Sequence, residues 1–401
     1  MNEYLYELAL RKAGEILRKV SAASLEPLRE HALREWVEYL PPPEEIGSVA
    51  AVDGSHNTIE FKAFTLYALL AYGLTSDLVA GEASVRLVGD VDVLQPPGVP
   101  DMIQLYRELA EAVAAYLVSG ADLLMVDGSV RALLIHPRPL ANTGRLNRAL
   151  TKVEELMGEG FYENLWERVR DRLRALEESD TVVDPFVSKE VVRDHGLVSA
   201  EYMDAAALIG YLEKLMVIRA LLERKAVGAR RRGLVYVSKT SRSQLYFREV
   251  IRAENVVPVV SDMHVFSAFT SSPGYSRPLL QSEALEGEDE ALKALPARGE
   301  LGRIIKGFFD GVDFIITYVR LVDGGPLLKL EIPVQAGHPD PEGLVRWFVG
   351  ALAAVSVGGY PLPLAEADRG ARITREEMVL LAKSLGILPS LTGREVLGTW
   401  L

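Results

Sequence analysis

The stretches "AVDGSH" at residues 51–56 and "MVDGSV" at residues 125–130 place the tripeptide Asp-Gly-Ser twice in this chain, each time after a short apolar run. Ordinary composition predicts roughly 0.1 copies of this tripeptide in a chain of this length. A Gly after a strand-like segment often marks a turn, so two unrelated turns are the simplest interpretation. The alternative is that two strands each end in an aspartate at the same edge of one sheet.

A pair of aspartates at one sheet edge would favour a bound cation. The Gly after each Asp allows a sharp turn, and the following Ser can hydrogen-bond locally and brace it. Adjacent carboxylates repel one another unless a divalent cation joins them, and oxygen ligands suit hard ions such as Mg²⁺ or Mn²⁺. Asp53 and Asp127 are therefore candidate metal ligands for phosphoryl-transfer chemistry.

Bulk composition sets broad limits on the class of protein. The chain has 401 residues and no Cys, so one large or two modest domains are expected, and disulfides and Cys-based zinc sites are excluded. No run of about 18 uncharged apolar residues predicts a membrane span, and the first residues do not resemble a secretory signal, so we expect a soluble cytoplasmic protein. The net charge of −12 argues against a protein that coats nucleic acid through bulk charge, but not against a nuclease with an acidic metal site.

The hydrophobic pattern predicts a mixed α/β core that begins near residue 46. Strand-like segments at 47–53 and 83–94 enclose an apolar segment at 61–73 that fits either strand or helix, and a helix at 101–118 precedes a buried strand at 122–127. Residues 2–40 read as amphipathic helices, and residues 141–228 are mostly helical and highly charged. Further strands are predicted at 233–238, 256–260, 312–322 and 327–333, and further helices near 341–357, 374–385 and 393–399.

A third acid would have to come from the helix at 101–118. On a helical wheel, its apolar face excludes both Glu108 and Glu111, with Glu111 nearer the border. Arg107 lies four residues before Glu111, a spacing typical of a surface ion pair. The wheel alone therefore favours a solvated Glu111.

The order strand–strand–strand–helix–strand has an Asp at the end of the first strand, a Glu on the helix and an Asp at the end of the fourth strand. This pattern resembles the ribonuclease H-like fold, in which the three acids bind two metal ions. The segments "AVDGS", "YRELAEAVAAYLVSGADLLMVDGS", "VYVSKTSRS", "VVSDMH" and "GYPLPLAEADRGARIT" are similar to those of the NurA family of archaeal and bacterial nucleases, which work with the HerA hexameric ATPase. This resemblance extends from about residue 46 to about residue 380. It implies a ribonuclease H-like mixed sheet flanked by helices, with N-terminal helices and a helical insertion.

The corresponding division of the chain has four parts. Residues 1–45 form an N-terminal helical segment, residues 46–140 and 229–385 the nuclease core, residues 141–228 a helical insertion, and residues 386–401 a C-terminal tail helix.

The resemblance also implies roles for single residues. Asp53, Glu111 and Asp127 match the metal-binding acids of the family, and Lys239 matches a lysine that could contact a phosphate. Asp262 lies in a family-like "SD" segment of weaker specificity.

One position departs from the family pattern. Asp368 stands where the family usually has a His that completes the metal site, and Asp is also an acceptable ligand for a hard metal. His338 is the competing fourth ligand, although a lone His before Pro is more often a loop residue. Tyr360 packs either at the metal site or in the core.

Basic residues cluster at 218–242, and the candidate DNA contacts among them are Arg231, Arg232, Lys239 and Arg242. Such a run is usually a solvated helix end. If it flanks the metal site, it is the natural track for a phosphate backbone.

The resemblance implies a DNA nuclease dependent on Mn²⁺ or Mg²⁺, with two ions in its site. Its expected activities are 5′–3′ exonuclease and single-strand endonuclease cleavage, in DNA-end resection with a HerA-type ATPase, and its expected state is a homodimer.

Two alternative functions remain. An ATP-binding enzyme of the actin and sugar-kinase class also uses strand-end Asp-Gly turns, although the C-terminal half has no Gly-rich adenosine loop. The other is a catalytically inactive partner of the ATPase, for which Asp368 is the sequence hint.

Overall fold

The computed structural model describes residues 3–20, 22–95, 98–135, 140, 143–158, 160–197, 202–225, 233–253, 260–281 and 311–387. Its strands are β1 (Trp36–Val37), β2 (Ser48–Glu60), β3 (Thr65–Asp77), β4 (Glu82–Leu94), β5 (Leu123–Asp127), β6 (Thr181–Val183), β7 (Gly233–Ser238), β8 (Gly274–Ser276), β9 (Leu279–Gln281), β10 (Val312–Arg320), β11 (Leu327–Gln335), β12 (Ser356–Val357) and β13 (Tyr360–Pro361). Its helices are α1 (Glu3–Val20), a 3₁₀ helix η1 (Ala22–Leu28), α2 (Arg29–Glu35), α3 (Val99–Leu117), α4 (Val130–Ile135), α5 (Thr143–Met157), α6 (Phe161–Leu176), α7 (Val187–Asp194), α8 (Met203–Lys225), α9 (Arg248–Ala253), α10 (Asp262–Phe269), α13 (Pro341–Ala354), α14 (Leu362–Ala371) and α15 (Arg375–Ser384).

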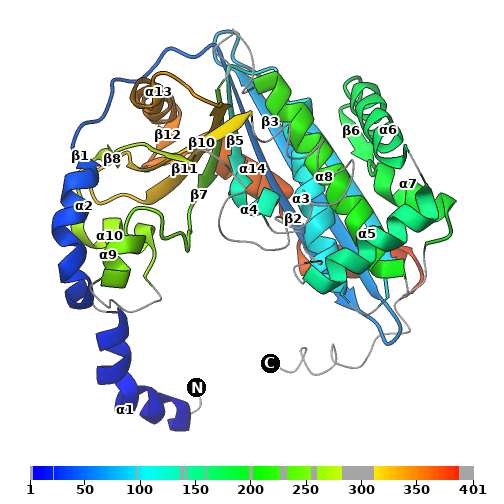
Figure 1. Cartoon of the computed structure of the whole chain (residues 1–401), viewed down its shortest axis with the longest axis horizontal. Helices are drawn as coiled ribbons and strands as arrows, with labels where there is room; N and C mark the ends of the chain where they lie inside the picture. Colours follow the sequence, from blue (N-terminus) through cyan, green and yellow to red (C-terminus); the bar gives the residue numbers. More distant parts are fainter. Residues whose placement is uncertain are drawn as a thin grey trace.

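One large mixed sheet organises these elements (Figure 1). Its strand order is β1-β8-β10-β11-β7-β5-β2-β3-β4-β6, and β9 pairs with β10. In its centre β3 runs antiparallel to β2 and β4, whereas β5 is parallel to β2 and β7 is parallel to β5. The predicted ribonuclease H-like mixed sheet flanked by helices is therefore confirmed.

The first strand is longer than the sequence pattern predicts. We expected β2 to end at Asp53, but it continues to Glu60 because β3 pairs with it along its whole length. Its other neighbour, β5, stops earlier, with Val52 opposite Val126. Asp53 therefore lies where the pairing with β5 ends, although it is not at the end of its own strand. The ambiguous segment at 61–73 belongs largely to β3 and is a strand.

Two layers of helices cover the sheet. The alternating residues Ala50, Val52, Leu124 and Val126 pack in one core cluster with α3 and α8, whereas Ala51 and its alternating neighbours pack on the opposite face with α13 and α14. Successive side chains of a strand point to opposite faces. The odd-numbered aspartates at 53 and 127 therefore face α13 and α14.

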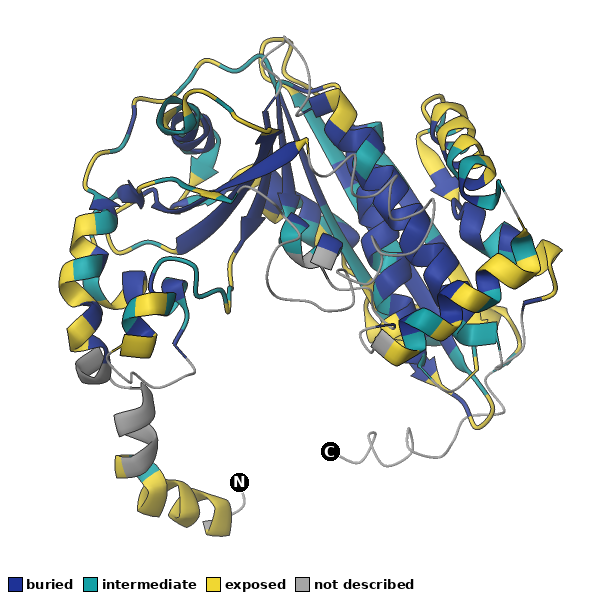
Figure 2. Ribbon diagram, in the orientation of Figure 1, coloured by how far each residue is buried: buried dark blue, intermediate teal, exposed yellow. Residues whose placement is uncertain are grey.

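The segment 143–225 carries α5, α6, α7 and α8, and its short strand β6 joins the sheet beside β4. The buried α8 lies against α3, and the exposed faces of α6 and α7 point outward (Figure 2). Helix α1 extends away from the sheet (Figure 1). Among the described residues, no helix has the length and apolarity needed to span a bilayer. The predicted strand at 256–260 and helix at 393–399 fall on residues 254–259 and 388–401, which lie outside the described residues, apart from Val260.

Candidate metal centre

Three adjacent strands and one helix bring the first group of predicted site residues together. Asp53 lies in β2, Asp127 ends β5, and Lys239 follows β7 directly. The Lys239 ammonium lies 3.5 Å from Oδ2 of Asp127 and 3.7 Å from Oδ1 of Asp368, which projects from α14. The structure thus gathers the two Asp-Gly-Ser aspartates, Lys239 and Asp368 on one face of the sheet.

The two Asp-Gly-Ser copies adopt different backbone conformations. Gly128 is in the left-handed region with φ 108°, its N–H donates to the Val237 carbonyl at 2.9 Å, and its own carbonyl accepts from the Ser238 hydroxyl at 2.7 Å. The second copy is therefore the predicted turn, and β7 holds it. In the first copy Gly54 stays in the extended strand β2, so the turn predicted there is wrong.

The prediction that each serine braces its turn locally is also wrong. The Ser129 hydroxyl lies 2.8 Å from both carboxylate oxygens of Glu331 in β11. The Ser55 hydroxyl donates to the Ala371 carbonyl at the end of α14. Both serines therefore fasten the site to elements that are distant in sequence.

Glu111 is buried, contrary to the helical-wheel expectation, with 6% of its surface exposed. Since α8 covers the outer side of α3, this helix has almost no solvated face. The Arg107 guanidinium pairs with Glu111 and also donates to the Gly54 carbonyl at 3.0 Å. Glu108 is buried too, but it points to Lys214 of α8 at 2.8 Å. Of the two glutamates on this helix, the one facing β2 is Glu111.

Burial and mutual repulsion perturb these carboxyl groups. Burial and the nearby Asp127 carboxylate raise the pKa of Asp53 to about 6. Burial raises the pKa of Glu111 to about 8, against the opposing effect of Arg107. Burial also raises the pKa of Asp127, although the Lys239 ammonium opposes this shift. Raised pKa values on neighbouring acids make this group of residues a functional-site candidate.

Comparison with known proteins identifies the family of this chain. A sequence model described as the NurA domain matches residues 47–373. The chain belongs to the NurA family. The probable DNA double-strand break repair nuclease NurA of Methanocaldococcus jannaschii is 22% identical over 399 residues, covering 96% of this chain and 89% of the relative. The DNA double-strand break repair nuclease NurA of Sulfurisphaera tokodaii is 22% identical over 396 residues, covering 96% and 95%.

Solved NurA structures share the fold. The NurA nuclease from Sulfolobus solfataricus superposes with a TM-score of 0.66 at 16% identity, covering 96% of this chain and 97% of that chain. A NurA structure bound to dAMP and manganese gives a TM-score of 0.68 at 18% identity, covering 97% and 98%. NurA relatives have therefore been crystallised with manganese.

Tyr360 lies at the site in this NurA chain. The Lys239 ammonium is 5.0 Å from the centre of the Tyr360 ring. Burial lowers the pKa of Lys239, but the Tyr360 hydroxyl together with the carboxylates of Asp127 and Asp368 outweighs this effect and raises it above the ordinary value. Burial and the nearby Asp127 carboxylate raise the pKa of Tyr360 to about 12. Lys239 therefore stays charged between the carboxylates and the ring.

The remaining candidates lie elsewhere. Asp262 is fully buried and accepts hydrogen bonds from the backbone N–H groups of residues 245–247, so it braces the segment that follows Lys239. His338 follows β11, which runs antiparallel to β7, and therefore lies toward the opposite end of the sheet from Asp127. Arg242 is exposed three residues after Lys239, and Arg231 and Arg232 lie outside the described residues.

The oxygen donors of this site fit a hard divalent cation. Asp53, Glu111, Asp127 and Asp368 are all carboxylates, the ligand type that Mg²⁺ and Mn²⁺ accept. In the described part of the chain, no three acidic or histidine side chains surround a common point as placed. Instead, Lys239 pairs with Asp127 and Asp368, and Arg107 pairs with Glu111. These two cations offset part of the negative charge of the four carboxyl groups.

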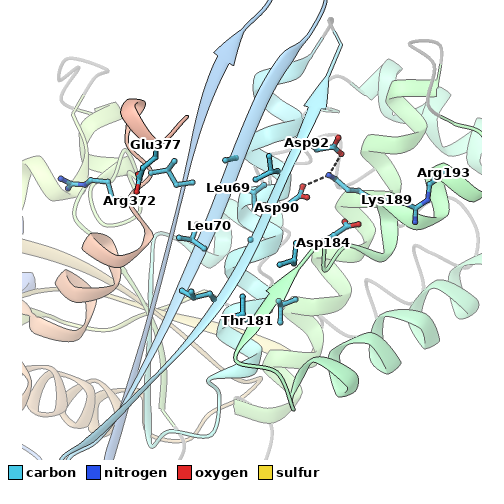
Figure 3. Close-up of a pocket in the computed structure, with 17 residues that line it drawn as sticks. Leu69, Leu70, Asp90, Asp92, Thr181, Asp184, Lys189, Arg193, Arg372 and Glu377 are labelled. Atoms are coloured by element: carbon cyan, nitrogen blue, oxygen red, sulfur yellow. Dashed lines mark hydrogen bonds and ion pairs between the residues drawn. The ribbon is translucent and has the colours of Figure 1, made fainter. Parts of the chain in front are cut away.

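A cavity of about 700 Å³ lies beside the sheet edge formed by β4 and β6 (Figure 3). Two of its acids share one cation, because the Lys189 ammonium lies 2.6 Å from Asp90 and 2.7 Å from Asp92. Arg372 lines this cavity and also lies 3.5 Å from Asp368. The carboxyl groups at 53, 111 and 127 stay the candidate metal centre, because burial raises the pKa of all three.

Sequence reasoning missed a buried ion pair next to the site. Lys329 and Glu331 of β11 are 3% and 0% exposed, and their side chains are 2.6 Å apart. The signal was present in "LLKLEIPV", where two opposite charges at i and i+2 interrupt an apolar strand. Residues at this spacing share one face of a strand, and charges within an apolar run are uncommon unless they are paired.

Proposed function

We propose that this chain is a metal-dependent DNA nuclease that hydrolyses phosphodiester bonds. Its membership of the NurA family and the nuclease names of its relatives support the reaction class. The observation that carries the proposal is the placement of Asp53 and Asp127 where the neighbouring strands β2 and β5 stop pairing, with Glu111 packed against Gly54, the residue after Asp53. The pKa values of all three acids are raised. These carboxyl groups would ionise fully when a divalent cation binds beside them. The same cation would supply the metal that this kind of phosphoryl transfer uses.

In this proposal four carboxylates hold the metal, and Lys239 faces the phosphate. Asp53, Glu111, Asp127 and Asp368 would bind Mn²⁺ or Mg²⁺, with two ions in the site. The metal, when bound, would activate a water for attack and stabilise the leaving oxygen. Lys239 remains charged, and its side chain is 42% exposed, so it can neutralise a phosphate that enters from solvent. Arg107 would hold Glu111 in place through their ion pair.

The DNA substrate would approach the exposed end of β7. Lys239 and Arg242 lie on the segment that leaves this strand. Arg231 and Arg232, which precede the first residue of β7 in the sequence, stay candidate contacts from the sequence alone. Because the whole chain carries a net charge of −12, any attraction for a phosphate backbone must be local. We infer from the family resemblance that the substrates are single strands and duplex ends, cleaved by 5′–3′ exonuclease and single-strand endonuclease action.

We further infer a place in DNA-end resection, a homodimeric state and a HerA-type hexameric ATPase as partner. The repair function named for the relatives supports the biological setting. Helix α1 extends from the body and exposes more than half of the surface of Tyr4, Leu5, Tyr6 and Leu10, which is typical of a surface that packs against another chain. Analytical ultracentrifugation of the full chain, alone and mixed with the ATPase, tests both associations.

The decisive experiment compares Asp53→Asn and Asp127→Asn with Asp92→Asn, an acid on the same sheet whose partner is Lys189. Cleavage of single-stranded and duplex DNA is measured with Mn²⁺, and circular dichroism reports the fold. We expect both site variants to lose cleavage while folded, and Asp92→Asn to keep it. Full activity in either site variant contradicts the proposal. A wild-type protein that binds no Mn²⁺ at micromolar concentrations would instead indicate an inactive partner, and stabilisation by ATP alone would favour the kinase-like alternative.

A further inference from the structure

The buried pair of Lys329 and Glu331 has a geometry that stability alone does not explain. Neighbouring residues of β11 such as Leu328 and Leu330 pack with the core on the α13 side, so the pair faces the other side of the sheet. A buried ion pair costs desolvation, and apolar residues of similar size often stabilise a fold equally well. The value of this pair must therefore come from what it contacts.

Glu331 holds the turn that follows Asp127. Its two carboxylate oxygens lie 2.8 Å from the Ser129 hydroxyl, and its Oε2 accepts from the Arg131 backbone N–H at 3.1 Å. Ser129 is two residues after Asp127, in the second Asp-Gly-Ser tripeptide. A fully buried carboxylate in β11 thereby fixes the backbone that carries a proposed metal ligand from β5.

Lys329 holds the segment that follows Lys239. Its ammonium donates to Oε1 of Glu331 at 2.6 Å and to the Ser243 hydroxyl at 2.9 Å. The Ser243 carbonyl in turn accepts from the backbone N–H of Asp262 at 2.8 Å. The ion pair therefore joins the loop after β5 to the loop after β7.

We propose that Lys329 and Glu331 are positioning residues that fix the Asp127 turn relative to the Lys239 segment. The role named here rests on the proposed nuclease function, whereas the fixing of the two loops does not. Neither side chain is a proposed metal ligand or phosphate contact, so the pair acts through Ser129, Arg131 and Ser243. Groups that orient metal ligands in this way typically change metal affinity or activity about 10- to 100-fold when they are removed.

The test compares Glu331→Gln and Ser129→Ala with a matched buried control. Gln keeps the shape of Glu331 but removes the charge that pairs with Lys329. The control is Glu213→Gln, because Glu213 is also a buried carboxylate held by backbone N–H groups, those of Val187 and Ser188, in contacts remote from the proposed metal ligands. Mn²⁺ affinity, kcat and KM for DNA, and amide hydrogen exchange of residues 127–131 are measured for each variant.

We expect Glu331→Gln to lower kcat or Mn²⁺ affinity about 10-fold or more, with KM changed less than about 3-fold. Exchange of residues 127–131 should accelerate in this variant and stay unchanged in Glu213→Gln. Ser129→Thr, which keeps the hydroxyl, should retain more activity than Ser129→Ala. Combining Ser129→Ala with Glu331→Gln should cost little more than the larger single change, since both act on one turn.

Unchanged exchange of residues 127–131 in a folded Glu331→Gln protein overturns the proposal. So does a loss of activity that is no larger than in Glu213→Gln at equal thermal stability. If the wild-type protein cleaves no DNA, the nuclease function fails, but the exchange and Mn²⁺ measurements still decide whether the pair positions the turn.

Discussion

Gly54 lies directly against Glu111, so closely that a Cβ added to Gly54 would be 2.6 Å from both Cγ and Oε1 of that side chain. Atoms at this separation overlap, so the carboxyl group of α3 can reach β2 only because residue 54 has no side chain. The Gly of the first Asp-Gly-Ser is thus required for close approach, whereas Gly128 of the second is required for its positive φ. One tripeptide serves two different physical needs.

Replacing Gly54 with Ala should displace the Glu111 carboxyl group. We expect a loss of about 1–3 kcal/mol in the free energy of unfolding, since extra volume enters a packed interface. Nuclease activity should fall at least 10-fold, because Glu111 is a proposed ligand. Urea unfolding and DNA cleavage with Mn²⁺ check both effects. Gly120→Ala is the control, since a Cβ there meets nothing within 4 Å, and equal behaviour of the two variants would contradict the steric argument.

Metal binding at neutral pH should release a proton from Glu111. With a pKa of about 8, Glu111 is mostly protonated at pH 7 in the metal-free protein. A bound cation needs the ionised form, so Mn²⁺ affinity should rise with pH up to about pH 8, and binding at pH 7 should release most of one proton. Calorimetry in buffers of different ionisation enthalpy measures this number. Glu111→Gln should abolish most of the release, and identical binding enthalpies in all buffers for the wild-type protein would refute the prediction.

The position of Asp53 and Asp127 on neighbouring strands, and the order of strands and helix along this part of the chain, could be predicted because they depend on local pattern. Asp53 and Asp127 each follow an apolar run, and the period of hydrophobicity separates the strands from the helix between them. The full length of β2 could not be predicted, because its last residues are held by pairing with β3 after β5 has stopped. That pairing is a property of the assembled sheet.

The side chains around the aspartates depended on contacts that are distant in sequence. A helical wheel treats the side of α3 away from its apolar stripe as solvated, but α8 covers it from about 100 residues further along the chain, with Lys214 opposite Glu108. The serines at 55 and 129 were expected to bond locally, but their partners are the Ala371 carbonyl and the Glu331 carboxylate, which are distant in sequence. A single sequence does not reveal which remote element will bring a partner.

Neutralising Lys239 should impair catalysis more than folding. Its side chain is 42% exposed, so Lys239→Met should leave thermal stability nearly unchanged. Without the ammonium, a phosphate in the site loses its proposed charge partner, and kcat/KM should fall about 100-fold. The pKa of Asp127 should rise further, because Lys239 normally opposes its upward shift. Steady-state cleavage assays measure the effect, and Lys383→Met on the exposed face of α15 is the control. Cleavage within 2- to 3-fold of wild type would exclude a phosphate-neutralising role.

Asp368 is the position at which metal preference should be adjustable. It projects from α14 toward Lys239, and Ser55 fastens the end of this helix to β2. Asp368→Ala should lower Mn²⁺ affinity about 10-fold or more, since one oxygen donor is lost. Asp368→His should recover binding and shift the preference from Mg²⁺ toward Mn²⁺, because imidazole is a softer ligand than carboxylate. Competition titrations of the two metals, paired with cleavage assays, measure the shift.

His338→Ala is the matched comparison for the Asp368 variants, since His338 lies toward the other end of the sheet and its removal should change neither metal affinity nor cleavage. A larger effect at residue 338 than at residue 368 would show that Asp368 is not the fourth ligand.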